Sequence, residues 1–304
     1  MPKHVIRSPF FYVGDKYKLM PQLKELFPQK ISTYVEPFAG GGSSFLNTNA
    51  ERYLLNDVDF YVVELHKCLS SYSKKKGAFL RKLYGYIREY NLSCSYKNVT
   101  VPDELKKTYV KTYYSKYNKN SYDRMKVDFN RDKSNMVLLY LLLIYGFNHM
   151  IRFNGAGDFN LPVGNVDFNK NVYKAISSYM DFMKSKNVSF FNSDFQTFLN
   201  DVELDADSYV YFDPPYLISG SEYNKYWNES EEHRLCDFID SINDRGIKFG
   251  ITNLVNHKGK VTTTFLEWSK KYIAYSIKSN YISFNDNTIK AESKELFVTN
   301  YGTT

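Results

Sequence analysis

A cluster of three glycines directly follows a strand-like segment, and this feature constrains the fold more than any other in the sequence. Residues 33–38 have the pattern of a strand, and Gly40, Gly41 and Gly42 separate it from a segment that we expect to be helical. The absence of side chains lets the backbone of such a turn approach a nucleoside closely. The pattern favours an α/β fold with a nucleotide-like cofactor, although a tight turn alone also requires glycines.

The glycine turn differs from two common phosphate-binding motifs. No Lys-Ser or Lys-Thr pair follows the glycines, so the turn is not of the Walker type. A dinucleotide fingerprint would need a third glycine near Phe45, where the side chain is large. Asp57 ends the next strand about 15 residues further on, a position suited to accepting hydrogen bonds from ribose hydroxyls.

Strand and helix patterns alternate at both ends of the chain but not in its middle. Residues 18–26 have helical spacing, and residues 53–55 begin a second extended run. Residues 58–133 are amphipathic and helical, with a break near residues 91–102. The later pattern predicts strands at 188–191, 208–212, 247–251, 272–277 and 295–301, a helix at 230–242, and a hairpin-style turn at 154–157.

The interruption predicts an α/β domain that is split by an insertion. We expect residues 1–68 and 172–304 to form the sheet domain, which would be mostly parallel with an antiparallel strand near the C-terminus. Residues 69–171 would form a helical and hairpin insertion. A chain of 304 residues is long enough to bury the core of such an enzyme without disulfides or metal ions.

The net charge of +7 is concentrated in one segment. Residues 71–124 hold 13 Lys and Arg against 4 Asp and Glu, which leaves +9, together with ten tyrosines. A basic face with aromatic side chains suits a polyanion with stackable bases. A solvated helical face explains the same composition equally well.

Cysteine spacing and hydropathy indicate a cytosolic protein. Cys68, Cys94 and Cys236 show no CxxC spacing, so we expect neither a disulfide framework nor a zinc site. The N-terminus has no apolar run of signal-peptide length, and the longest apolar stretch, near residues 136–144, is too short to span a membrane.

A buried type of strand ends abruptly at the tetrapeptide Asp213-Pro214-Pro215-Tyr216. Because proline fixes φ and lacks an amide hydrogen, the backbone leaves the sheet in a rigid, extended shape. We expect the Asp213 carboxylate and the Pro214 carbonyl to be two fixed acceptors, with the Tyr216 ring just beyond. An exocyclic amine donates two hydrogen bonds, and a flat ring stacks on an extruded base. The tetrapeptide therefore predicts a site for a planar amine, against the simpler interpretation of a turn.

The order of the glycine turn, the insertion and Asp-Pro-Pro-Tyr resembles that of the Dam-type (D12 class, alpha group) adenine-N6 DNA methyltransferases over nearly the whole chain. The resemblance implies a Rossmann-like S-adenosylmethionine-dependent methyltransferase sheet, with residues 69–171 as the target-recognition domain. It implies direct methyl transfer to N6 of an adenine flipped out of duplex DNA. The leading Asp213 favours adenine N6 over cytosine N4, for which Ser-Pro-Pro-Tyr is more typical.

The resemblance also implies which residues form the cofactor site and the catalytic site. Residues 11–16 stand where the family usually has Trp-x-Gly-Gly-Lys, and Tyr12 and Asp15 depart from that pattern while Lys16 matches it. Asp57 matches the acid that binds ribose, and Asp194 matches the acid near the cofactor's adenine. The implied catalytic residues are Asp213, Pro214, Pro215 and Tyr216, and the implied cofactor-binding residues are Tyr12, Lys16, Glu36, Pro37, Phe38, Gly40, Gly42, Asp57, Asp194 and Asp213.

Residues 147–154 and 158–162 look like the family's recognition hairpin, in which an aromatic side chain wedges into the duplex and an arginine reads a base edge. The implied DNA contacts are Phe147, Asn148, Met150, Arg152 and Asn154. Arginine suits guanine O6 and N7. Ordinary core packing is the alternative for Phe147 and Met150. Residues 223–227 correspond to a loop that would close over the flipped base.

We expect no metal ion, because no histidine forms a ligand pair at helical spacing among His4, His66, His149, His233 and His257. The expected partner is duplex DNA, with no membrane, for a monomer in the cytoplasm of a bacterium or phage host, associated with the nucleoid. In a restriction–modification system, a cognate restriction endonuclease encoded nearby would be a further partner. Two alternatives stay open: methylation of another planar amine, such as cytosine N4, RNA adenine or a protein glutamine, and a catalytically silent DNA-binding relative.

Overall fold

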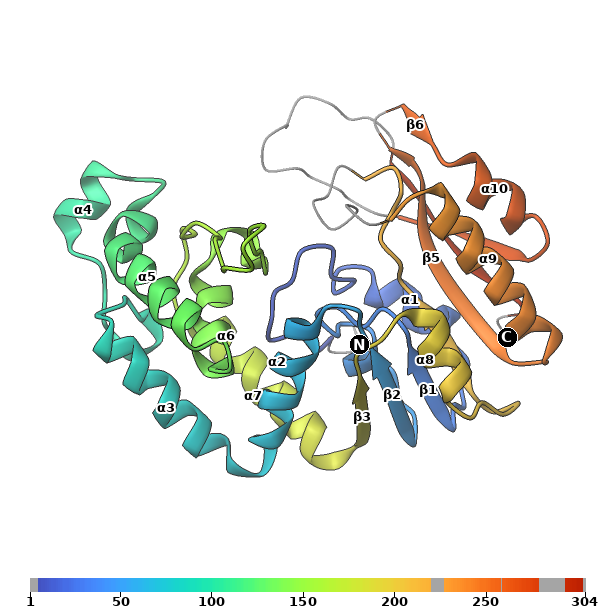
Figure 1. Cartoon of the computed structure of the whole chain (residues 1–304), viewed down its shortest axis with the longest axis horizontal. Helices are drawn as coiled ribbons and strands as arrows, with labels where there is room; N and C mark the ends of the chain where they lie inside the picture. Colours follow the sequence, from blue (N-terminus) through green and yellow to red (C-terminus); the bar gives the residue numbers. More distant parts are fainter. Residues whose placement is uncertain (1–4, 220–226, 258, 279–292, 303–304) are drawn as a thin grey trace.

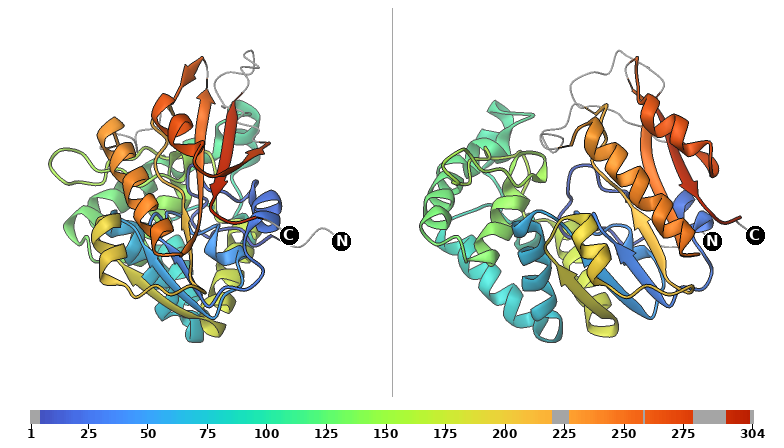
Figure 2. Two further views of the ribbon diagram at one scale, coloured as in Figure 1. Left: turned by 90° about the vertical axis from the view of Figure 1, so that its right-hand side faces the viewer. Right: turned by 45° about the vertical axis from the view of Figure 1, so that its right-hand side comes forward.

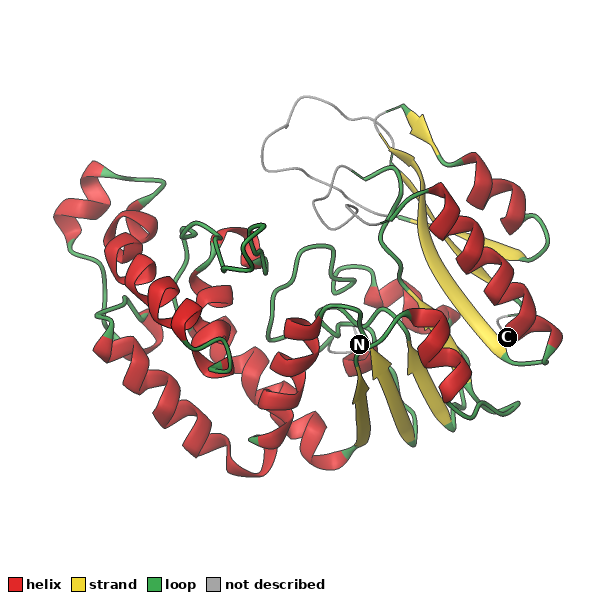
Figure 3. Cartoon of the chain, viewed as in Figure 1, coloured by secondary structure: helices red, strands yellow, loops and turns green. Residues whose placement is uncertain are grey.

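The computed structural model describes residues 5–219, 227–257, 259–278 and 293–302, and a single sheet forms the centre of this part of the chain (Figures 1 and 3). The sheet has eight strands in the order β3-β2-β1-β4-β5-β8-β7, and β6 pairs with β5 outside this path. The strands are β1 (Thr33–Glu36), β2 (Arg52–Asn56), β3 (Asn187–Phe191), β4 (Tyr209–Phe212), β5 (Lys248–His257), β6 (Lys260–Val261), β7 (Ile273–Ile277) and β8 (Lys294–Thr299).

Helices supply the rest of the regular structure in the described residues. The α-helices are α1 (Met20–Leu26), α2 (Phe60–Ser71), α3 (Lys76–Glu89), α4 (Asp103–Thr108), α5 (Tyr113–Arg131), α6 (Met136–Tyr145), α7 (Lys170–Ser185), α8 (Phe195–Asp201), α9 (Glu229–Asp244) and α10 (Thr263–Ser269). The 3₁₀ helices are η1 (Phe45–Asn47), η2 (Ser73–Lys75), η3 (Ser95–Lys97) and η4 (Phe147–His149).

The sheet confirms the predicted architecture. Strands β3, β2, β1, β4 and β5 are parallel, whereas β8 is antiparallel to both β5 and β7. The strand order reverses direction between β1 and β4, which are neighbours in the sheet. In open α/β sheets, ligands bind outside the carboxyl ends of the strands at such a point.

The two faces of the sheet bury different residues, because side chains alternate along a strand. Tyr34 and Tyr209 pack into one core with helices α1, α2, α6 and α7. Their neighbours Val35 and Val210 pack into the other core with α8, α9 and α10. Both faces are therefore covered, as a mostly parallel sheet requires.

Helices α3 to α6 lie beside the sheet, beyond β3, and not over either face (Figures 1 and 2). They join the sheet region through α2, which packs on α6 and α7. The predicted helical pattern over residues 58–133, with its break at residues 91–102, is confirmed. Two of the ten tyrosines of the basic segment, Tyr90 and Tyr122, are buried in the core. The division at residues 68 and 172 stays a prediction.

The prediction of a helix after the glycine turn was wrong, because the segment forms only the single 3₁₀ turn η1. Side chains take the acceptors that a longer helix would use. Asn47 Nδ2 donates to the Ser43 carbonyl at 2.8 Å, and Thr48 Oγ1 donates to the Ser44 carbonyl at 3.0 Å. Such local bonds compete with the helical hydrogen bonds.

Candidate active site

The Asp-Pro-Pro-Tyr segment begins immediately after β4, at the same edge of the sheet as the glycine turn after β1. Val35 of β1 pairs with Val210 of β4 in a parallel register, so the two strands deliver their C-terminal ends side by side. Hydrophobic burial fixes both strands, since every residue of β4 is buried. The fold thus brings together two segments that lie far apart in the sequence.

Two donors hold one oxygen of the Asp213 carboxylate. Lys16 Nζ lies 2.7 Å from Asp213 Oδ1, and Thr252 Oγ1 donates to the same atom at 3.2 Å. The Tyr216 hydroxyl oxygen lies 3.3 Å from Asp213 Oδ1, but its hydrogen points to the closer Glu295 carboxylate. From the described part of the chain, no hydrogen bond reaches Asp213 Oδ2 or the Pro214 carbonyl. One side of the carboxylate is therefore fixed, while Oδ2 and the neighbouring carbonyl are available as acceptors.

A second carboxylate, Glu295 on β8, lies behind this site. Its side chain has no solvent exposure, accepts a hydrogen bond from the Tyr216 hydroxyl, and lies 4.0 Å from Lys16 Nζ. Lys16 Nζ also lies 4.7 Å from the centroid of the Tyr216 ring. Burial alone would lower the pKa of Lys16, but the negative charges of Asp213 and Glu295 outweigh it and raise the pKa. Lys16 is therefore a buried ammonium shared by two carboxylates.

The backbone of the glycine turn is held on both sides at Gly40. The Gly40 amide donates to Asp57 Oδ2 at 2.8 Å, and His66 Nε2 lies 2.9 Å from the Gly40 carbonyl. Burial lowers the pKa of His66 to about 4, so the ring is neutral. Because a carbonyl only accepts, Nε2 must carry the hydrogen, and Nδ1 accepts from the Tyr179 hydroxyl at 2.9 Å.

Two of the three glycines are needed for internal packing. A Cβ on Gly42, where φ is +85°, would lie 2.3 Å from the Phe45 ring, and a Cβ on Gly41 would lie 2.8 Å from Tyr12 Cβ. At Gly40 the nearest atom would be 4.0 Å away. The turn is thus open to a ligand at Gly40, which agrees with the assignment of this residue to the cofactor site.

Glu36 Oε2 is buried near the turn without a hydrogen-bond partner among the described residues, and Asp15 Oδ2 and Ser43 Oγ, also buried, have at most a weak contact with each other. Burial and the charge of Asp213 raise the pKa of Glu36 well above its usual value. Burial also raises the pKa of Asp57 to about 6. Unpaired buried acceptors are costly, so their concentration here fits a ligand that brings an ammonium group and hydroxyls, as S-adenosylmethionine does.

Asp194 lies in a different environment from the other acids. It caps α8 by accepting from the Gln196 amide at 2.9 Å, and both its oxygens contact Arg234, at 2.9 and 2.7 Å. The Arg234 guanidinium in turn lies 4.3 Å from the centroid of the Phe195 ring. No motif in the sequence pointed to Arg234 or Phe195, although Phe195 directly follows the predicted acid.

Phe38 packs in an aromatic cluster beside Asp194. Its ring lies 5.4 Å from that of Phe195 and 5.6 Å from that of Trp227. Trp227 Nε1 is buried without a hydrogen-bond partner in the described part of the chain. Of the predicted loop over residues 223–227, only Trp227 lies within the described residues. Pro37, also assigned to the cofactor site, accepts from Asn56 Nδ2 at 3.0 Å through its carbonyl.

The predicted hairpin is present, but it forms isolated bridges and no continuous ladder. Gly146 pairs with Val163 and Phe153 with Phe159. A Cβ on Gly164 would lie 2.5 Å from the Gly146 carbonyl oxygen, so the two chain segments meet closely at the base of the hairpin. The predicted turn at residues 154–157 is confirmed by the hydrogen bond from the Gly157 amide to the Asn154 carbonyl at 2.9 Å.

The hairpin side chains differ in exposure. Phe147 is 49 % exposed, so the core-packing alternative is wrong for this residue, whereas Met150 is half-buried against the core. Asn148 has φ of +53°, a strained conformation for a residue with a side chain. Arg152 Nε donates to Asn160 Oδ1 at 2.9 Å. Asn154 Oδ1 accepts from the Ala156 and Asp158 amides, which gives this residue a role in shaping the turn.

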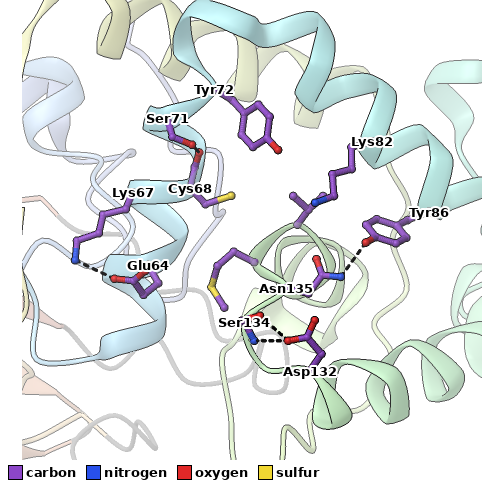
Figure 4. A pocket seen from close by; sticks show the side chains of 12 residues that line it. Glu64, Lys67, Cys68, Ser71, Tyr72, Lys82, Tyr86, Asp132, Ser134 and Asn135 are labelled. Carbon is purple, nitrogen blue, oxygen red and sulfur yellow. Dashed lines mark hydrogen bonds and ion pairs between the residues drawn. The ribbon is translucent and has the colours of Figure 1, made fainter.

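A cavity of about 570 Å³ lies elsewhere, between α2, α3 and the start of α6 (Figure 4). Its walls include the ion pair of Lys67 with Glu64 and the hydrogen bond from Asn135 to Tyr86. None of the predicted site residues lines it. This cavity is therefore separate from the candidate site at Gly40 and Asp213.

The described residues contain no group of three or more His, Cys, Asp or Glu side chains placed to hold a metal ion. Cys68, Cys94 and Cys236 are free thiols. No helix in the described ranges is long and apolar enough to cross a bilayer.

The mostly parallel sheet, with the loops after β1 and β4 meeting at one edge, is consistent with the fold of S-adenosylmethionine-dependent methyltransferases. Comparison with known families is more specific. The chain belongs to the D12 class N6 adenine-specific DNA methyltransferase family, whose model matches residues 12–283. The family predicted from sequence is thereby confirmed.

Relatives with curated names include two modification enzymes that are longer than this chain. The chain is 34 % identical to type II methyltransferase M.FokI of Planomicrobium okeanokoites, over 97 % of this chain and 43 % of that protein. It is 28 % identical to modification methylase StsI of Streptococcus sanguinis, over 99 % of this chain and 44 % of that protein. The chain therefore spans less than half the length of these relatives. It is 26 % identical to a DNA adenine methylase of Escherichia coli, over 92 % of this chain and 90 % of that protein.

Proposed function

We propose that this chain transfers a methyl group from S-adenosylmethionine to N6 of an adenine flipped out of duplex DNA. The observation that carries the proposal is the pair of acceptors left available after β4, Asp213 Oδ2 and the Pro214 carbonyl. The amino group of adenine has two hydrogens to donate, which matches two acceptors. Family membership and the name of the Escherichia coli relative support the same activity.

The two acceptors address the chemical difficulty of the reaction. The lone pair of the adenine amine is delocalised into the ring, which makes the amine a poor nucleophile. Acceptors that draw both amino hydrogens favour a tetrahedral nitrogen with a localised lone pair, and they do so without reorganisation because Pro214 and Pro215 fix the backbone. Asp213 and Pro214 would thus hold and activate the amine.

Tyr216 would stack against the extruded base. Lys16 covers one face of its ring, so the base would use the opposite face. The hydroxyl of Tyr216 is held by Glu295, which fixes the ring plane. Glu295 would also share the charge of Lys16, so that the ammonium binds Asp213 less tightly and the carboxylate stays a good acceptor.

The cofactor site would consist of residues around the glycine turn. We propose that the turn at Gly40 and the unpaired oxygens of Glu36 and Asp15 bind the amino-acid end of the cofactor, and that Asp57 binds its ribose. The Phe38 cluster and Asp194 would surround its adenine. When bound, S-adenosylmethionine supplies an electrophilic methyl group on a sulfonium. The neutral His66 would keep the Gly40 carbonyl, and hence the turn, in place.

Recognition of the DNA would fall to the hairpin. The exposed Phe147 suits a wedge between base pairs, and Arg152, aligned by Asn160, suits the edge of a guanine. We propose that residues 69–171 form the target-recognition domain and that the chain acts as a monomer on nucleoid DNA in the cytoplasm of a bacterium or phage host. The relatives named modification methylases support membership of a restriction–modification system with a cognate endonuclease.

The test is analysis of nucleosides from plasmid DNA after incubation with the chain and S-adenosylmethionine. We expect N6-methyladenine with the wild type and none with Asp213→Ala, while sinefungin affinity changes little. Asp207→Ala, which removes an exposed carboxylate before the other end of β4, is the matched control and should retain turnover. Formation of N4-methylcytosine, methylation of RNA or protein instead of DNA, or full activity of Asp213→Ala would refute the proposal.

A further inference from the structure

An exposed arginine, Arg7, lies between the loop that carries Lys16 and the recognition hairpin. Its guanidinium carbon is 4.8 Å from the centroid of the Phe11 ring and 4.9 Å from that of the Tyr17 ring. Within the described ranges, the Arg7 guanidinium makes no hydrogen bond or ion pair with any side chain or carbonyl. Two aromatic rings therefore hold the cation in place while its donors remain available.

The segment around Arg7 is anchored to both the cofactor turn and the insertion. The buried Ser8 hydroxyl donates to the Gly41 carbonyl, and the Tyr140 hydroxyl of α6 donates to the Pro9 carbonyl at 2.9 Å. Phe10 is fully buried and packs beside His66, with ring centroids 4.5 Å apart. Arg7 thus projects from a fixed backbone, and this N-terminal loop runs between the insertion and the sheet (Figure 1).

The aromatic contacts of Arg7 continue into the hairpin. The Phe11 ring lies 5.5 Å from the ring of His149, at the base of the hairpin. Phe11 and His149 have φ of +52° and +51°, conformations that side-chain-bearing residues adopt at a cost and that cluster at functional sites. The contact between Phe11 and His149 joins two segments. One is the N-terminal loop, whose Lys16 contacts Asp213, and the other is the hairpin, which would enter the duplex.

A nucleotide flipped into the site would bring a backbone phosphate to this junction. The base would enter the site at Asp213 while the hairpin engages the neighbouring base pairs, so the backbone next to the flipped nucleotide passes between the two. Guanidinium groups bind phosphate through paired donors, and stacking on aromatic rings leaves those donors free. Burial raises the pKa of Asp15 and the charge of Arg7 lowers it in part, but the two side chains form no ion pair, so Asp15 does not occupy the donors of Arg7.

We propose that Arg7 binds a backbone phosphate next to the flipped nucleotide. This inference rests on the proposed function, since it requires duplex DNA as the ligand. It assigns to the N-terminal loop a DNA contact outside the hairpin and outside the basic segment of residues 71–124. Because phosphates carry no sequence information, the contact would strengthen binding to every duplex equally.

The test is the affinity for a short fluorescein-labelled duplex of mixed sequence, measured by anisotropy over a range of salt concentrations. We expect Arg7→Ala to weaken binding about tenfold and to reduce the slope of log K against log salt by about 1. Tyr17→Leu should weaken binding about threefold with an unchanged slope, because it removes a ring and leaves the charge. Arg245→Ala, an exposed arginine after α9, is the matched control and should match the wild type.

The possible results separate the two proposals. If wild type methylates DNA but Arg7→Ala binds it like Arg245→Ala, the phosphate contact is refuted and the proposed function stands. If Arg7→Ala loses sinefungin affinity or thermal stability along with DNA affinity, its role is structural and the contact is also refuted. If wild type neither binds nor methylates duplex DNA, both proposals fail.

Discussion

The catalytic site and the recognition hairpin differ in where the side chains that support them come from. Asp213 and Tyr216 are held by side chains from distant parts of the chain, namely Lys16, Thr252 and Glu295. The hairpin has local contacts within its own polar groups, such as Arg152 with Asn160 and Asn154 with Asp158, and it is attached to α5 through Asn130, which bonds the Phe159 amide and carbonyl. The first site is mostly buried, whereas the second exposes Phe147 at its base.

This difference has consequences for what each region tolerates. A side chain held by several elements keeps its position only if the whole sheet is intact, so changes there should couple to stability and to one another. A local hairpin can change its exposed side chains without disturbing the sheet. We therefore expect substitutions near Asp213 and Gly40 to affect every substrate, and substitutions in the hairpin to affect the choice among DNA sequences.

The largest effect is expected on the pH dependence of the free energy of unfolding, and it should differ between substitutions of His66 and of His149. His66 has a folded-state pKa of about 4, below its ordinary value of 6.5, so its contribution is present above pH 6.5 and is lost as the pH falls toward 4. We expect the free energy of unfolding of wild type to drop relative to that of His66→Gln by up to about 3 kcal/mol between pH 7 and pH 4. The measurement is urea unfolding at both pH values.

His149 at the hairpin is the matched comparison, because burial lowers its pKa too. His149→Gln should change the same pH difference less than His66→Gln does, since His66 is fully buried and bonded to Gly40. An equal effect at the two positions would contradict the contrast between a buried, fold-wide site and a local hairpin.

A smaller effect is expected from Glu295→Gln. The glutamine still accepts from the Tyr216 hydroxyl but removes one of the negative charges beside Lys16, so the ammonium would bind Asp213 more tightly and make it a weaker acceptor. We expect kcat to fall about thirtyfold, or about 2 kcal/mol, on all DNA sequences. Since Glu295 helps raise the pKa of Lys16, the alkaline limb of kcat should move to lower pH. Pre-steady-state methyl transfer as a function of pH would measure both.

The exposed Glu203 provides the control, because Glu203→Gln removes the same charge far from Lys16. Unchanged kcat in Glu295→Gln, or a fall in kcat with no displacement of the alkaline limb, would show that Glu295 does not act through the charge of Lys16.

The smallest effect is expected from Asn160→Ala in the hairpin. The change removes the hydrogen bond to Arg152 Nε, while Arg152 Nη2 still donates to the backbone carbonyl of residue 160 at 3.0 Å, so the plane of the guanidinium is fixed less firmly. We expect discrimination between the preferred site and single-base variants to fall by about 1 kcal/mol at one position, with kcat on the preferred site nearly unchanged. Ratios of kcat/KM for the duplexes are the measurement. Arg152→Ala should reduce discrimination at the same base position more strongly. If the two variants lost discrimination at different base positions, Asn160 would not act by aligning Arg152.

The same contrast explains what could be predicted from the sequence. The two prolines and the three glycines are local signals. They correctly predicted the end of the strand before Asp213 and the turn after β1. Glu295 and Thr252 carry no local signal, because their roles depend on β5 pairing with β4 and on β8 pairing with β5. The helix expected after Gly42 failed for a local reason, since Asn47 and Thr48 redirect the hydrogen bonds.

Asp194 shows the same limit: its position had a local sequence signal, but its partner did not. Its position after β3 was predicted, but its bidentate contact with Arg234 joins residues that are 40 positions apart and depends on α9 packing near α8. Phe147 was ambiguous in sequence, because apolar residues at its spacing are usually buried. The left-handed Asn148 that follows it is associated with the turn that exposes Phe147.

The most direct test of the two acceptors after β4 is a crystal structure with sinefungin and a duplex that contains the preferred site. We expect an extrahelical adenine whose N6 lies about 3 Å from both Asp213 Oδ2 and the Pro214 carbonyl, with Lys16 still on Asp213 Oδ1. An adenine that stays stacked in the duplex, or an N6 that contacts other groups while these two oxygens face solvent, would contradict this expectation.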